Sequence, residues 1–213
     1  MRSGVGGLLL GDPAQITSAH AAVIRDLGFT GASVMLPDPD GVSKEVLTYA
    51  RQTLADAGVH VARANARYPS IVDADPERRA EGIRLAQRAC VGAHVLNADF
   101  LLIRPCSLNL TGDWRPHPSN HTAETEARLV DSLAAVCTVA SSEGVTIGLE
   151  CGSISSLDSP CAGPARDRHG RITSSPLQLR PSQLRRDIPT GVRHIGTDRR
   201  HLPPPLTTSS VPT

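Results

Sequence analysis

Five short apolar runs alternate with four stretches of helical periodicity over the first 150 residues of the 213-residue chain. The runs cover residues 5–10, 29–36, 59–64, 100–103 and 145–149. Each intervening stretch opens on a residue that caps helices well, and these residues are Asp12, Ser43, Asp75 and Thr122. Such alternation is typical of a parallel sheet whose strands are joined by right-handed helical crossovers.

The segments that follow the apolar runs are longer and more polar than those that follow the helical stretches. This asymmetry is typical of a TIM-type barrel, in which chemistry is placed on the loops after the strands. We therefore predict a partial (β/α) barrel of five βα units over residues 1–158 and an irregular tail over residues 159–213. An open flavodoxin-like sheet is disfavoured because no phosphate-binding loop follows the first run.

One carboxylate stands where a catalytic group of such a barrel would be expected. In residues 144–150 Val145, Ile147 and Leu149 alternate with smaller residues, and Glu150 follows at the end of the pattern. A carboxylate that has no function and is only solvated at the end of a strand would give the same spacing. The pattern alone therefore leaves both interpretations of Glu150 open.

Residues 1–160 resemble the xylose-isomerase-like (β/α)8 family of sugar isomerases and epimerases. The resemblance rests on residues 144–151 and 157–160, with support from 75–82 and 125–130. It implies a divalent metal, Mg²⁺ or Mn²⁺, held by side chains at the ends of strands five to eight. Glu150 falls on the first of these positions, so the resemblance implies a metal ligand and catalytic residue there. Cys151 departs from the family pattern.

The resemblance also implies a small sugar-like substrate and proton transfer between adjacent carbons of a keto or hydroxy sugar. We expect Asn65, Tyr68 and Trp114 on loops over the active face, where they would contact the sugar. Arg104, at a predicted strand end, would bind a phosphate or carboxylate, although a surface ion pair explains it equally well. His117 and His121 straddle Pro118, which disfavours a metal site there.

Net charge, hydropathy and cysteine content indicate which partners and which cellular location to expect. Residues 1–160 carry 13 Lys and Arg against 18 Asp and Glu, a net charge of −5, whereas the remaining residues carry 9 Arg and 3 Asp, giving +6. The acidic body disfavours nucleic acid as a partner. It therefore also disfavours the function of a DNA-repair endonuclease of the same superfamily. No apolar run suits a membrane span. Five widely spaced cysteines indicate reduced thiols and a cytoplasmic location.

The strand pattern stops after Pro160. Residues 161–213 contain eight prolines and no aromatic residue, although a complete barrel needs about 250 residues. Possible codons for two tail segments, read one base later, encode family-like sequence, which favours a shifted reading frame over a basic disordered extension. We therefore expect no bound metal and no activity as written, or a non-catalytic half-barrel that serves as an interaction module. Open sheet edges would favour a homodimer.

Overall fold

The computed structural model describes residues 4–9, 11–112, 115–150 and 177–179 of the chain. They form one sheet with the strand order β1-β2-β3-β4-β5-β6. The strands are β1 (Gly4–Val5), β2 (Gly31–Leu36), β3 (His60–Ala66), β4 (Leu101–Ile103), β5 (Ile147–Leu149) and β6 (Leu177–Leu179). Strands β1 to β5 pair in parallel, and β6 pairs antiparallel to β5. The predicted partial TIM-type barrel is confirmed.

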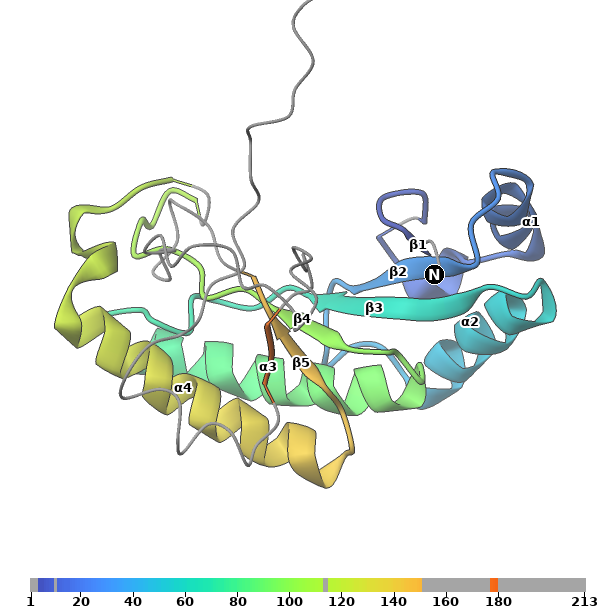
Figure 1. Ribbon diagram of the computed structural model, residues 1–213. Helices are drawn as coiled ribbons and strands as arrows, with labels where there is room; N and C mark the ends of the chain where they lie inside the picture. Colours follow the sequence, from blue (N-terminus) through green and yellow to red (C-terminus); the bar gives the residue numbers. More distant parts are fainter. Residues whose placement is uncertain (1–3, 10, 113–114, 151–176, 180–213) are drawn as a thin grey trace, which may run out of the picture.

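Four α-helices and two short 3₁₀-helices lie between the strands in the described part of the chain. They are η1 (Pro13–Gln15), α1 (Ser18–Asp26), α2 (Lys44–Asp56), α3 (Pro76–Val95), η2 (Pro118–His121) and α4 (Ala123–Ser142). Helices α2, α3 and α4 lie along one face of the sheet (Figure 1). None of the helices in the described ranges is both long and apolar enough to cross a membrane.

The two faces of the sheet differ in chemistry. In β2, Ala32, Val34 and Leu36 are buried and contribute to the core, whereas Ser33 and Met35 between them are half-buried. The end of strand β3 shows the same alternation, with Ala64 and Ala66 buried and Asn65 between them half-buried. Because successive strand residues point to opposite faces, one face packs on the helices and the other is mixed and partly accessible.

The first βα unit differs from the sequence prediction. The expected strand over residues 5–10 is reduced to Gly4–Val5, and the expected helix after Asp12 is divided. Pro13 starts a single 3₁₀ turn, but Ile16 then adopts an extended conformation and is 1% exposed. Thr17 caps a new helix in which Ala21 and Ile24 are buried, whereas Val23 and Leu27 are exposed. The helix is therefore interrupted at Ile16, where the chain is extended and the side chain is buried in the core.

The tail expectation needs one correction. Leu177–Leu179 form β6, with Leu177 opposite Leu149 and Leu179 opposite Ile147, so these residues are not irregular and the β5 edge is covered. The other residues of the tail lie outside the described part of the chain. Strand β1 pairs only with β2 among the described strands, so its outer edge remains the candidate open edge.

The contact between α3 and the loop after β3 leaves no room for a side chain at Gly82. A Cβ at this buried position would lie 2.4 Å from the backbone oxygen of Pro69. At Gly92, ten residues further along the same helix, a Cβ would instead meet the Leu36 side chain, with 2.9 Å to its Cδ1. A side chain can rotate away from such a contact, whereas a backbone carbonyl moves only with its loop.

We therefore expect Gly82→Ala to lower the free energy of unfolding by about 1–3 kcal/mol, although alanine favours helix by up to about 1 kcal/mol. Gly92→Ala is the matched control and should cost less. Urea unfolding followed by circular dichroism measures both. Equal or greater stability of Gly82→Ala would contradict the close packing of α3 on this loop.

Candidate functional site at the C-terminal ends of the strands

Polar side chains from β2 and β3 are joined on the sheet face away from the core. Arg63 donates from Nε to Ser33 Oγ at 3.2 Å, and Asn65 donates from Nδ2 to the same oxygen at 3.0 Å. A Cβ at Gly6 would lie 3.0 Å from an Arg63 amino nitrogen, so the glycine leaves room for the guanidinium. Since the carboxyl ends of parallel strands meet at one edge, Asn65 lies near that edge. It belongs to β3 and not to a loop as predicted.

Glu150 follows β5 directly and keeps the register of the sheet. Its backbone N–H donates to the Ile103 oxygen at 2.9 Å, which extends the ladder one residue past the strand. Period-two alternation then places Glu150 on the same side as Gly148, where a Cβ would lie 2.7 Å from the Phe100 ring. Ile147 and Leu149 belong to the core cluster. Glu150 is therefore half-buried on the non-core side of the sheet.

Arg104 follows β4 and reaches back to the end of β3. Its amino group donates to the Ala66 oxygen at 3.3 Å, and its side chain is half-buried. A guanidinium and the Glu150 carboxylate thus follow the ends of neighbouring strands. This arrangement offers a fixed positive charge and a proton acceptor at one barrel mouth.

Tyr68 ties the ends of β3 and β4 together. Its hydroxyl accepts from the Arg104 N–H at 2.7 Å and donates to the Arg104 carbonyl at 3.2 Å, and only 6% of the residue is exposed. Burial raises the pKa of Tyr68 and the nearby thiol of Cys106 raises it further, Arg104 lowers it in part, and the carboxylate of Glu150 makes the smallest contribution, which also raises it. Tyr68 therefore lies close to Glu150, and its hydroxyl forms hydrogen bonds with the backbone of Arg104.

The loop after β4 has an ordered interior that the sequence did not reveal. Asn120 is 1% exposed, accepts from the Leu108 N–H at 2.9 Å and donates to Ser107 Oγ at 2.9 Å. Near the start of this loop, Cys106 has a positive φ of 64°, a conformation that is uncommon outside glycine. No sequence motif marks this network, because its partners are set by loop geometry.

The structure brings four of the five predicted site residues to neighbouring strand ends. Asn65, Tyr68, Arg104 and Glu150 belong to β3 or follow β3, β4 and β5 within two residues, whereas Trp114 lies outside the described residues. The roles of these residues in substrate contact stay predictions.

The described residues do not provide a complete metal site. Within the part of the chain that the structure describes, no group of three or more His, Cys, Asp or Glu side chains could hold a metal ion. Glu150 alone supplies one carboxylate, whereas Mg²⁺ demands near-octahedral oxygen coordination. The donor set in the described ranges therefore does not fit the resident divalent metal that the sequence resemblance implies.

A parallel sheet with helical crossovers and polar groups at the strands' carboxyl ends defines an α/β protein of the TIM-barrel class. The xylose isomerase-like TIM barrel family model matches residues 21–154. The chain belongs to this family. A comparison with curated proteins finds no significant sequence match.

Solved structures of sugar epimerases share the fold. L-ribulose 3-epimerase superposes with a TM-score of 0.55 at 22% identity, covering 70% of this chain and 49% of that structure. D-psicose 3-epimerase, solved in the presence of D-fructose, gives 0.53 at 18% identity, with coverages of 71% and 51%. The 3-keto-D-glucoside 4-epimerase of E. coli gives 0.50 at 17%, with 71% and 56%. The chain thus spans about half the length of these structures.

Removing the Tyr68 hydroxyl tests its role at the strand ends. In Tyr68→Phe the half-buried Arg104 N–H loses its acceptor beside the buried ring of residue 68, which costs about 1–3 kcal/mol. Urea unfolding should show this loss. Tyr49→Phe is the matched control, because Tyr49 is 62% exposed, and it should leave stability unchanged. A Tyr68→Phe variant as stable as the wild type would contradict a stabilising role of the hydrogen bonds between Tyr68 and the Arg104 backbone.

The raised pKa of Tyr68 also predicts a pH dependence. The unfolded chain, with a tyrosine pKa of about 10, releases this proton before the folded protein does. The contribution of Tyr68 to stability is therefore fully present below about pH 10 and is lost as the pH rises above it. In unfolding experiments from pH 8 to 11, the wild type should lose more stability than Tyr68→Phe. Parallel curves would contradict the prediction.

Proposed function

We propose that this chain carries the sugar-binding part of an isomerase or epimerase site, with Glu150 as its carboxylate and a small ketose as its ligand. The observation that carries the proposal is the position of Glu150. It directly follows the fifth parallel strand of a family barrel, on the partly accessible face, next to the strand that Arg104 follows. The names of the structurally similar epimerases support a sugar as the ligand.

The chemistry of the two side chains suits proton transfer beside a carbonyl. A carboxylate can accept the proton from the carbon next to the carbonyl group. A guanidinium can stabilise the negative charge that develops on the carbonyl oxygen. Asn65, held by Ser33, would bind a sugar hydroxyl. No step is assigned to a divalent metal, because the donor set of the described residues does not fit one.

We infer that the chain as written binds sugar without turning it over. We expect D-fructose to bind in the millimolar range, and Glu150→Gln to weaken this binding at least about fivefold, a loss of roughly 1 kcal/mol. Ligand-observed NMR titration measures both. Leu27→Ser, at an exposed position of the α1 end, is the control and should bind like the wild type. Binding that does not depend on Glu150 would contradict the site.

Metal binding provides an independent test of the same proposal. One carboxylate is a weak site, so we expect no Mn²⁺ dissociation constant below about 1 mM. Calorimetric titration of wild type and Glu150→Gln measures it. Micromolar Mn²⁺ binding, or D-fructose epimerisation that is lost in Glu150→Gln, would replace our inference with that of an active metalloenzyme.

A non-catalytic half-barrel that pairs with a second copy is the alternative function. The outer edge of β1 is unpaired among the described strands, and half-buried Met35 and Leu102 lie on the face away from the core. An open edge favours strand pairing between chains. Size-exclusion chromatography over a range of concentrations should then show a dimer or larger species. A monodisperse monomer that unfolds cooperatively would contradict this alternative.

A further inference from the structure

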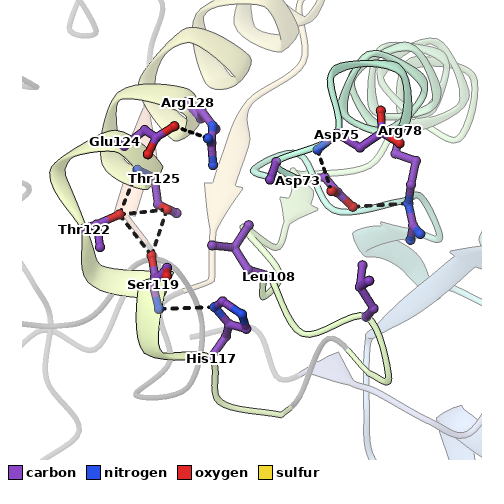
Figure 2. Close-up of a pocket in the computed structure, with 12 residues that line it drawn as sticks. Asp73, Asp75, Arg78, Leu108, His117, Ser119, Thr122, Glu124, Thr125 and Arg128 are labelled. Atoms are coloured by element: carbon purple, nitrogen blue, oxygen red, sulfur yellow. Dashed lines mark hydrogen bonds and ion pairs between the residues drawn. The ribbon is translucent and has the colours of Figure 1, made fainter.

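A cavity of about 520 Å³ lies outside the strand-end site, between the starts of α3 and α4. Its lining includes none of Asn65, Arg104 and Glu150. Figure 2 shows the residues that precede and begin α3 on one side, those that begin α4 on the other, and Leu108 and His117 between them. The volume falls in the range of small-molecule sites, roughly 300–1,000 Å³.

The walls of this cavity are held in place by internal contacts. Asp73 is 6% exposed, accepts from the Asp75 N–H at 3.0 Å and pairs with Arg78 at 3.2 Å. On the opposite wall, Thr122 caps α4, and Glu124 pairs with Arg128 one turn further on. The cavity is therefore a preformed feature of two helix starts and one loop.

His117 places a hydrogen-bond donor at this cavity. Its Nδ1 accepts from the Ser119 N–H at 3.2 Å, so this nitrogen carries no proton. In the neutral ring Nε2 then bears the proton, and this group has no partner within the described ranges. Asp75 accepts from Glu77 through Oδ1, which leaves its second oxygen as an acceptor. The lining thus offers donors and acceptors together.

The charge of the lining selects among ligand classes. Arg78 and Arg128 face three carboxylates, those of Asp73, Asp75 and Glu124, so the net charge is −1 with His117 neutral. This disfavours a simple anion. Leu108 and Leu110 add an apolar surface, and Leu110 is 73% exposed. A polyhydroxylated ring matches this combination, because its hydroxyls both donate and accept while its C–H face packs on apolar side chains.

We propose that the cavity is a second carbohydrate site, which binds a pyranose ring between the starts of α3 and α4. The proposal rests on the proposed function only for the class of ligand, and it does not require Glu150. The loop after β4 serves both sites, since it begins at Arg104 in the strand-end site and supplies Leu108, Leu110, His117, Ser119 and Thr122 to the cavity.

The experiment uses the full chain with D-glucose as the probe, followed by saturation-transfer NMR. His117→Asn retains a side-chain oxygen that can cap η2 but removes the ring, and Leu110→Ser removes the apolar surface. Each should weaken glucose binding at least about fivefold, or roughly 1 kcal/mol. Leu27→Ser is the matched control for Leu110, being an exposed leucine elsewhere. It should bind like the wild type.

Four results would overturn the proposal. They are absence of glucose binding, binding that is equal in all variants, binding that is lost in Glu150→Gln, and displacement of glucose by an equal concentration of inorganic phosphate. The third places glucose at the strand-end site, and the fourth identifies an anion site. Thermal unfolding of each variant checks its fold, and Leu110→Ser keeps the test decisive if His117→Asn unfolds. Loss of D-fructose binding alone would affect only the function proposed for Glu150.

Discussion

The structure depends first on the burial of one sheet face against α2, α3 and α4. The core-side residues of β2 to β5 are small or branched aliphatic side chains, such as Ala32, Val34, Ile103 and Ile147, and all four are at most 1% exposed. Aromatic side chains make up only 2% of the sequence, so close approach replaces side-chain bulk. Gly92 on α3 allows this approach to Leu36 of β2, and Gly82 allows the same helix to approach the loop after β3. Packing on one face leaves the opposite face free to carry polar groups.

The burial pattern explains how much of the fold could be predicted from the sequence. Apolar alternation gave the order and direction of the parallel strands, and cap residues such as Ser43, Asp75 and Thr122 marked three helix starts correctly. The unit after Asp12 was misjudged, because the periodicity ran across a break that burial of Ile16 imposes. Strand β6 was missed because three residues in a proline-rich segment carry too weak a pattern.

The position of a candidate site residue was predictable only where it follows from the alternation of side chains along a strand. Glu150 was found from the end of an alternating run, and its half-buried position away from the core follows from the same period. Tyr68 shows the limit of this reasoning. A tyrosine after a strand resembles a ligand contact in the sequence, but its partner is a backbone group 36 residues away. Only the pairing of β3 and β4 in the structure shows that the hydroxyl both donates to and accepts from the backbone of Arg104.

The loop after β4 connects the two parts of the molecule that could bind sugar. At its start, Tyr68 fixes the backbone of Arg104, and the buried side chain of Asn120 orders the region from Ser107 onward. At its end, Thr122 caps α4 and so fixes the far wall of the cavity. A ligand at either site would bind to a segment that is already held by buried hydrogen bonds. Little ordering would then be required on binding.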